Sequence, residues 1–334
     1  MLDGMALIVL IVILALLFDF TNGWNDSANA IATIIATRGL KPIYAVLLAA
    51  VLNLVGAFAF TAVAKMIGGG IIKSEGITLA VVVAILVGGI IWNTGMTLIG
   101  MPISASHALI GGIIGAGVAH GGFQLIIASG VYKVLLAMLF SPVIGAFLSF
   151  LLMKIFNFIF ANYSPSKVKK LFRRLQLLSV SWLAFSHGTS DAQKSMGIIM
   201  MGLVAGGYVA SMDEPIPFWV ILACGLAMAL GTAIGGKKVI TTMGMRLSKL
   251  EPINGFSAEV ATSLILTFVA RIGIPVSSTH TITGSVIGVG LANRVNSVRW
   301  GLAGKIVYAW VFTLPGTAII SFLVYKLLQL FGLY

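Results

Sequence analysis

The chain has 334 residues, of which 59% are apolar and only 9% are charged, and its mean hydropathy is +1.08. Soluble domains carry about 25% charged residues, so this composition excludes an ordinary soluble enzyme and a disordered chain. The net charge of +12 does not indicate a nucleic-acid binder, because too few charges are present to cover a soluble basic surface. A helix needs roughly 20 apolar residues to cross a bilayer. The composition therefore predicts a polytopic membrane protein.

Apolar runs recur along the whole chain. In chain order they cover residues 5–18, 43–64, 77–99, 108–118, 124–140, 143–161, 177–185, 196–210, 218–234, 258–272, 281–292, 302–313 and 317–333. Helices are expected, because an open strand edge leaves unpaired backbone groups in lipid and these runs do not alternate as barrel strands do. We predict an all-α fold with roughly 10–12 membrane helical segments.

The basic residues predict how the chain lies in the membrane. The most basic segment, 164–176, is expected in the cytoplasm, and the start of the chain, which has no early Lys or Arg, is expected outside. Each half then crosses an odd number of times. We predict a repeat over 1–161, a basic cytoplasmic linker over 162–176 and a second, inverted repeat over 177–334 of a multi-pass cell-membrane protein.

Two pairs of motifs support this division. Pro-Ile-Ser-Ala-Ser-His at 102–107 returns as Pro-Val-Ser-Ser-Thr-His at 275–280, and the segment 22–29 parallels 187–194. The two motifs come in the same order in both halves. Inverted repeats are typical of secondary transporters, whose binding site lies near the bilayer midplane where the repeats meet. Glycines follow both Pro-containing motifs, at 111, 115 and 117 and at 284, 288 and 290, and predict close helix packing.

The polar residues of the first motif lie on one helix face. Asp19, Asn22, Asp26, Asn29 and Thr33 are spaced three or four residues apart. Carboxylates within a membrane span usually face a cavity or a partner, and oxygen ligands suit a hard cation. The second copy contributes Asp191 and Lys194, which can pair along the helix. The structural alternative is that these groups only hold helices together. The roles of Asp19 and Glu259 stay open.

The two Pro-containing motifs predict helix N-termini between apolar runs, since Pro suits a first helical turn and Ser or Thr caps it. Exposed N–H groups and the positive end of the helix dipole favour an anion there. Two such termini meeting at the midplane would suit a tetrahedral oxyanion. The candidate oxyanion-binding residues are Lys194, Ser104, Ala105, Ser106, His107, Ser277, Ser278, Thr279 and His280.

The motifs at 23–29, 186–197 and 235–244, with the two Pro-containing segments, resemble the inorganic phosphate transporter (PiT) family over essentially the whole chain. The resemblance implies symport of phosphate with Na⁺ or H⁺, inverted repeats with re-entrant helices, a homodimer, and no bound cofactor. The candidate cation ligands are Asn25, Asp26, Asn29, Ser190, Asp191 and Gln193. Ser190 departs from the family motif, which commonly has Asn there.

Three other functions fit parts of the sequence. Sulfate transport fits the same fold, although only a protonated phosphate can donate a hydrogen bond to a carboxylate such as Asp26. An intramembrane aspartyl protease would use Asp26 and Asp191 as a shared-proton dyad, but it leaves Asn29, Gln193 and Lys194 without a role. A passive channel would not need opposed repeats with broken helices. We therefore predict a cation-coupled phosphate symporter and no enzyme activity.

Overall fold

The protein is almost entirely helical. The computed structural model describes residues 4–332, with all side chains in that range except those of residues 27–29 and 245. Two isolated antiparallel bridges, Ile72 with Ile126 and Ser248 with Val298, are the only β pairings within 4–332. The α-helices of the described range are α1 (Gly4–Ala36), α2 (Pro42–Gly56), α3 (Ala62–Gly69), α4 (Leu79–Ile99), α5 (Ala105–Gly121), α6 (Ala128–Ile159), α7 (Pro165–Ala205), α8 (Phe218–Ile234), α9 (Lys237–Ile240), α10 (Pro252–Ile272), α11 (Ser278–Asn293) and α12 (Trp300–Leu330).

Several helices are long enough to cross a bilayer. Five of them, α1, α4, α6, α10 and α12, are also apolar enough to do so alone. A sixth candidate is α8 with the following residues 237–244, a pair bent by 67°. The break falls at Gly235 and Gly236, and Gly235 adopts a positive φ of 67°. The predicted all-α, multi-pass membrane fold is confirmed.

Some apolar runs that look separate in the sequence join into one helix. The runs on either side of Pro142 form α6, and those on either side of Pro315 form α12. The helices continue because a proline removes only one backbone donor, and neighbouring helices can compensate for it within a membrane protein. The first helix also extends beyond the run 5–18, through the polar motif to Ala36. Residues 165–176, predicted as a linker, form the first turns of α7.

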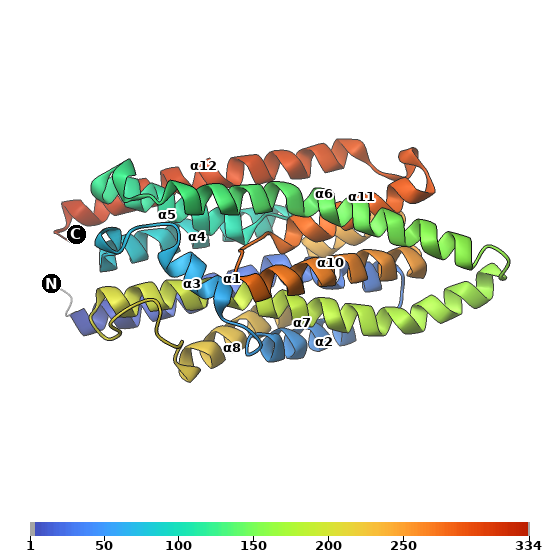
Figure 1. Ribbon diagram of the computed structural model, residues 1–334, viewed down its shortest axis with the longest axis horizontal. Helices are drawn as coiled ribbons and strands as arrows, with labels where there is room; N and C mark the ends of the chain where they lie inside the picture. Colours follow the sequence, from blue (N-terminus) through green and yellow to red (C-terminus); the bar gives the residue numbers. More distant parts are fainter. Residues whose placement is uncertain (1–3, 333–334) are drawn as a thin grey trace.

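Two helical hairpins point toward each other inside the bundle (Figure 1). In each hairpin a long helix ends at a glycine with positive φ, Gly100 after α4 and Gly273 after α10. A short unwound segment follows, and then the chain turns back as α5 or α11. These returning helices have 17 and 16 residues, about 25 Å of helix, which is less than the thickness of the hydrocarbon core.

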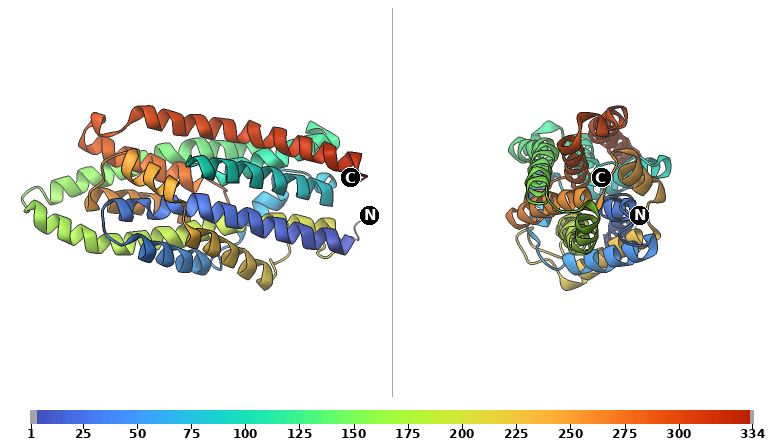
Figure 2. Two further views of the ribbon diagram at one scale, coloured as in Figure 1. Left: turned by 180° about the vertical axis from the view of Figure 1, so that it is seen from behind. Right: turned by 90° about the vertical axis from the view of Figure 1, so that its right-hand side faces the viewer.

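Corresponding helices of the two halves run in opposite directions. From the N-terminus, α1 runs away from the end where it starts, whereas α7 runs back toward it (Figure 1). The same relation holds for α6 and α12, and both chain termini lie at one end of the molecule (Figure 2). The connection between α6 and α7 lies at the other end. The two β bridges also correspond, because each ties the loop before one hairpin-forming pair to the loop after it.

Helices of one half pack against helices of the other half at two kinds of crossing. In the first kind, α1 packs on α8 and α7 packs on α2; in the second, α5 packs on α12 and α11 packs on α6. Glycines make both possible. A Cβ on Gly115 would lie 2.0 Å from the carbonyl oxygen of Ala318, and one on Gly288 would lie 2.1 Å from that of Ala146. The predicted close packing at these glycines is confirmed.

Replacing Gly115 by alanine is expected to destabilise the fold, because the new methyl group would collide with backbone atoms of α12 rather than with a flexible side chain. Overpacking of this kind costs about 1–3 kcal/mol. Thermal unfolding in detergent, followed by tryptophan fluorescence, measures the change. Gly304 on α12 provides the matched control, because a Cβ there meets nothing within 4 Å. Equal melting temperatures for Gly115→Ala and Gly304→Ala would contradict this account of the crossing.

Candidate functional site

The tips of the two hairpins are capped helix N-termini, as the sequence predicts. Ser104 is the N-cap of α5, and its side-chain oxygen accepts a hydrogen bond from the backbone N–H of His107 at 3.1 Å. Ser277 has the same role in α11, where it accepts from the N–H of His280 at 3.2 Å. Both serines are buried. The positive ends of two helix dipoles therefore lie inside the protein rather than at a water boundary.

The two tips contact each other directly. The Ser106 hydroxyl donates to the carbonyl oxygen of Val276 at 2.7 Å, which joins the start of α5 to the segment before α11. The rings of His107 and His280 have centroids 4.6 Å apart, and His280 also stacks on Trp310 of α12 at 3.7 Å. Corresponding segments from the two halves of the sequence thus form one buried junction at the centre of the bundle.

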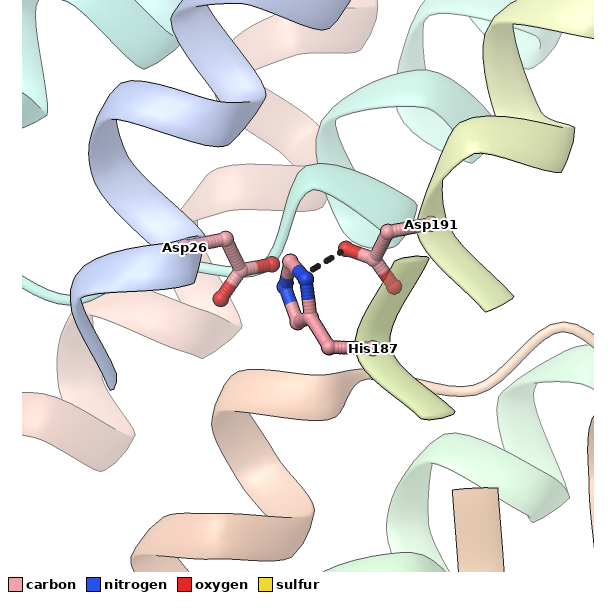
Figure 3. Close-up of side chains that lie close together, drawn as sticks. All are labelled: Asp26, His187 and Asp191. Atoms are coloured by element: carbon pink, nitrogen blue, oxygen red, sulfur yellow. Dashed lines mark ion pairs between the residues drawn. The ribbon is translucent and has the colours of Figure 1, made fainter. Parts of the chain in front are cut away.

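Carboxylates from α1 and α7 meet the tip of α11. The Ser278 hydroxyl lies 3.0 Å from Asp26 Oδ2 and 3.1 and 3.3 Å from the two oxygens of Asp191, and Thr279 donates to Asp26. Asp26 projects from α1, and Asp191 projects from α7 toward it (Figure 3). A hydroxyl group has a single proton to donate. Ser278 therefore cannot satisfy both carboxylates at the same time.

Further polar side chains surround Asp191. The Lys194 ammonium lies 2.8 Å from Asp191 Oδ2, which confirms the predicted pairing along the helix. His187 Nε2 lies 3.5 Å from the same oxygen, and its Nδ1 lies 3.2 Å from Asn53 Oδ1 of α2. The Asn22 amide points at Asp191 from α1, at 3.5 Å. Lys194 is completely buried, so its charge acts within this group and not at a surface.

The formal charges of this group do not balance. Asp26 and Asp191 contribute two negative charges against the single positive charge of Lys194, and His187 adds none when it is neutral. One ligand atom each from Asp26, His187 and Asp191 lies within 4.8 Å of the others, a spacing that can hold a metal ion. Carboxylate oxygens are the ligands that hard cations prefer. The geometry therefore suits one monovalent cation between α1 and α7.

The other candidate cation ligands lie in different surroundings. Gln193 turns to α3, where its side-chain oxygen accepts from the backbone N–H groups of Val63 at 2.7 Å and Ala64 at 3.2 Å. The Asn25 amide donates to Thr97 of α4 at 2.7 Å. Ser190 is buried beside Asp191 in the chain, and its hydroxyl has no hydrogen-bond partner among the described residues. The side chain of Asn29 lies outside the described part of the structure.

Two members of the group were not among the candidate ligands predicted from the sequence. His187 and Asn22 both lie within the repeated motifs and both face Asp191. The signal for His187 is its position four residues before Asp191, which places the two side chains on one helix face. The signal for Asn22 is its place on the polar face of the first motif, four residues before Asp26, but its partner Asp191 lies 169 residues away in the chain.

Glu259 forms a separate buried network nearer the α6–α7 end of the bundle. Its carboxylate accepts hydrogen bonds from Thr33 at 2.6 Å, from Gln176 at 2.7 Å and from Ser179. The network ties α10 to α1 and α7, and Thr37 extends it by donating to the Gln176 side-chain oxygen at 2.7 Å. All of these side chains are buried. Glu259 thus has the contacts of a residue that holds three helices together.

Replacing Glu259 by alanine is expected to lower the free energy of unfolding by about 3 kcal/mol, because three buried donors lose their acceptor. Glu259→Gln keeps one acceptor oxygen and is expected to lose about half as much. Chemical or thermal unfolding in detergent measures the loss of unfolding free energy in the two variants. If Glu259→Ala unfolds like the unmodified protein while transport is lost, Glu259 serves transport rather than the fold.

A cavity of about 560 Å³ lies beside the two central histidines. Apart from His107 and His280 its lining is apolar, and several lining residues such as Leu139 and Val311 are largely exposed on the outside of the bundle. Burying an anion against such a lining is costly, since it offers few hydrogen-bond donors. His107 and His280, two of the predicted phosphate-binding residues, line this apolar cavity, whereas the hydroxyls of Ser278 and Thr279 face the carboxylates of α1 and α7.

Comparisons with known proteins agree with this architecture. The model of the phosphate transporter family matches residues 22–321. A probable low-affinity inorganic phosphate transporter of Rhizobium meliloti is 48% identical over 96% of this chain and 96% of its own length. The corresponding protein of Bacillus subtilis is 43% identical over 97% of this chain and 98% of its own.

A solved structure has the same fold. It is that of a protein named "The sodium-dependent phosphate transporter", is 25% identical in sequence, and superposes with a TM-score of 0.91 over 97% of this chain and 99% of its own. The family match includes both hairpin tips and both carboxylates, and the two bacterial relatives extend over nearly the whole chain. The chain therefore belongs to the phosphate transporter family, whose members are membrane transporters and not enzymes.

Proposed function

We propose that the protein imports inorganic phosphate by symport with Na⁺, or with H⁺ in its place. The observation that carries the proposal is the contact of Ser278, at the N-terminus of α11, with both Asp26 and Asp191. It places the N-terminus of a helix, which attracts anions, against two carboxylates. Lys194 balances only one of their two negative charges. One cation neutralises this site, and a buried phosphate costs less beside the bound cation than it would beside the uncompensated carboxylates.

In this proposal the cation binds between Asp26 and Asp191, with the Ser190 hydroxyl and the amide oxygens of Asn25 and Asn29 as further candidate ligands. Gln193 has a different set of partners on α3 and supports the helix beside the site. The sodium dependence in the name of the solved relative favours Na⁺ as the cation to test first. No other cofactor is required.

Phosphate would bind at the junction of the hairpin tips. The first N–H groups of α5 and α11 have no partner within their helices. Five hydroxyl groups lie at these N-termini in the sequence, those of Ser104, Ser106, Ser277, Ser278 and Thr279. Two side chains are less free to bind it, because Ser106 donates to Val276 and Thr279 donates to Asp26. His107, His280 and Lys194 complete the set, together with the backbone of Ala105. A protonated phosphate can also donate to a carboxylate, which sulfate cannot do.

Transport would proceed by alternating access, in which the elements of one half rock against those of the other around the central site. Two features support this. The halves cross at glycine-lined contacts, and each hairpin reaches the site from the opposite end of the bundle (Figure 1). We propose that the two halves are residues 1–161 and 177–334. The termini would face the outside, and the basic residues of 164–176 would face the cytoplasm. A homodimer, which the family resemblance implies, is part of the proposal.

Uptake of radiolabelled phosphate into proteoliposomes tests the function. An inward Na⁺ gradient is expected to drive accumulation above equilibrium, and a proton gradient at constant Na⁺ provides the second arm. Excess sulfate is the competitor that separates the two anions. Failure of both gradients to drive accumulation would refute symport, and equal inhibition by sulfate and unlabelled phosphate would refute phosphate selectivity.

A further inference from the structure

A basic pocket lies at one end of the bundle, where the segment after α9 meets the segment before α12. Its volume is about 450 Å³, and Arg246, Lys249 and Arg299 line it together with the polar side chains of Asn296 and Ser297. No acidic residue of the described chain is part of this lining. The connection between α11 and α12 lies at the same end of the bundle as that between α6 and α7 (Figure 1), the end that the transport proposal orients toward the cytoplasm. The proposed symport makes no use of this pocket.

The three positive charges of the pocket are not compensated within the described part of the protein. The side chains of Arg246, Lys249 and Arg299 are all exposed. Both salt bridges found within residues 4–332 are made by Asp191 instead. The acidic residue nearest to the pocket in the sequence, Glu251, uses its carboxylate to cap the N-terminus of α10. Cations grouped around a concave surface attract an anion, because their electrostatic potentials add there.

The internal repeat indicates that the backbone of these loops does not require the two arginines. The two β bridges occupy equivalent positions in the two halves, and one of them lies beside this pocket. Next to it the N–H of Arg299 donates to a carbonyl oxygen across the bridge at 3.0 Å, and the N–H of Ile127 does the same at 2.8 Å in the other half. When the halves are aligned on the bridges, Arg246 corresponds to Gly70. The same backbone arrangement is thus built once with two arginines and once with none.

The lining of the pocket suits a phosphate group. A guanidinium group can bind phosphate through two parallel hydrogen bonds, and Asn296 and Ser297 add neutral donors. Free phosphate and a phospholipid headgroup both offer this chemistry, and two observations favour the lipid. An inorganic phosphate ion would fill only a small part of the pocket, whereas a glycerophosphate headgroup fills more of it. Trp300, which follows Arg299 at the start of α12, is half exposed, and exposed tryptophans are typical of the interface between membrane and water.

We propose that this pocket binds the headgroup of an anionic phospholipid, whose phosphate is held by Arg246 and Arg299 and whose acyl chains lie along the exposed apolar face of α12. Basic pockets between membrane helices on the cytoplasmic side suit such headgroups. A general bias of basic residues toward the cytoplasm places arginines at this end but does not group them around one pocket. Lipid binding here does not depend on the coupling of phosphate to Na⁺ or H⁺.

Native mass spectrometry of the purified protein, titrated with phosphatidylglycerol, measures the binding of the first lipid. The double variant Arg246→Gln with Arg299→Gln is expected to bind it about 30-fold more weakly, or by about 2 kcal/mol, because each cation near a headgroup contributes about 1 kcal/mol. Arg173→Gln with Arg174→Gln is the matched control, because it removes the same charges from exposed positions on α7 outside the pocket. The control is expected to bind phosphatidylglycerol as the unmodified protein does. Equal affinities of the two double variants would mean that the arginines act only as general surface charge, and would overturn the proposal.

Phosphatidylcholine and inorganic phosphate separate the possible ligands in the same titration. Phosphatidylcholine, whose headgroup has no net charge, is expected to bind the unmodified protein more weakly than phosphatidylglycerol does. Inorganic phosphate in excess is expected to leave the first phosphatidylglycerol bound, because it lacks the acyl chains. Equal binding of the two lipids would overturn the role of the charges. Displacement of phosphatidylglycerol by inorganic phosphate would identify free phosphate as the ligand and overturn the lipid site.

Lys249→Gln keeps the test valid if the double variant does not fold. It removes one cation of the pocket and is expected to weaken the binding of phosphatidylglycerol about fivefold, or by about 1 kcal/mol. Lys73→Gln is the matched control, because Lys73 follows the other β bridge just as Lys249 follows the bridge beside the pocket, and both side chains are exposed. Equal binding of phosphatidylglycerol by Lys249→Gln and Lys73→Gln would overturn the proposed site.

Discussion

Asp26→Asn is expected to abolish phosphate accumulation in proteoliposomes while the protein still folds. The substitution keeps the side-chain shape and one acceptor oxygen for Thr279, but it removes one of the two carboxylates that meet at Ser278. The loss of a charged partner from a buried ion pair costs about 3–5 kcal/mol. This corresponds to a loss of cation affinity of about 100-fold or more. Initial rates of gradient-driven uptake measure the effect.

Asp213→Asn is the control for this experiment. Asp213 is an exposed acidic residue in the segment between α7 and α8, and its replacement removes the same charge far from the centre of the bundle. Its uptake is expected to equal that of the unmodified protein. If Asp26→Asn also accumulated phosphate at the rate of the control, the cation could not depend on the Asp26 charge, and the proposed site would be wrong.

Lys194→Met is expected to destabilise the protein and to stop transport. The ammonium of Lys194 lies 2.8 Å from Asp191 in a fully buried environment. Methionine fills a similar volume but leaves two carboxylates facing each other around Ser278. Removing one partner of a buried ion pair costs about 3–5 kcal/mol. Thermal unfolding in detergent is expected to show a large fall in the melting temperature.

The double variant Asp191→Asn with Lys194→Met separates the two effects. It removes both charges together, and replacing a whole buried pair by neutral groups is often neutral for stability. The double variant is therefore expected to recover most of the lost stability without recovering transport. Recovery of both would mean that the pair only supports the fold. A melting temperature of Lys194→Met equal to that of the unmodified protein would contradict the ion pair itself.

The glutamine at 193 illustrates a limit of reasoning from motifs. The repeated segment contains Asp191 and Gln193, and both have oxygens that suit a cation. Residues two positions apart on a helix point in different directions, so only one of them can face Asp26. The structure turns Asp191 to Asn22 of α1 and Gln193 to the start of α3. The helix period alone does not say which of the two faces the site, because that depends on the neighbouring helix.

The features that the sequence determined by itself are local or periodic. Its composition excludes a soluble protein, the two pairs of motifs indicate an internal repeat, and Pro with hydroxyl residues marks the starts of α5 and α11. The pairing of Asp191 with Lys194 follows from their positions three apart on one helix. Each of these depends on residues close together in the chain or on patterns counted over all of it, for which no tertiary structure is needed.

Only the tertiary structure decided which polar groups meet. Ser278 lies between Asp26 and Asp191, although 252 residues separate it from Asp26. Glu259 accepts hydrogen bonds from side chains of α1 and α7. The apolar runs on either side of Pro142 join into one helix. Such contacts depend on how each helix is rotated and where it crosses its neighbours. That arrangement depends on close packing at glycines and on hydrogen bonds between distant segments, so no single segment encodes it.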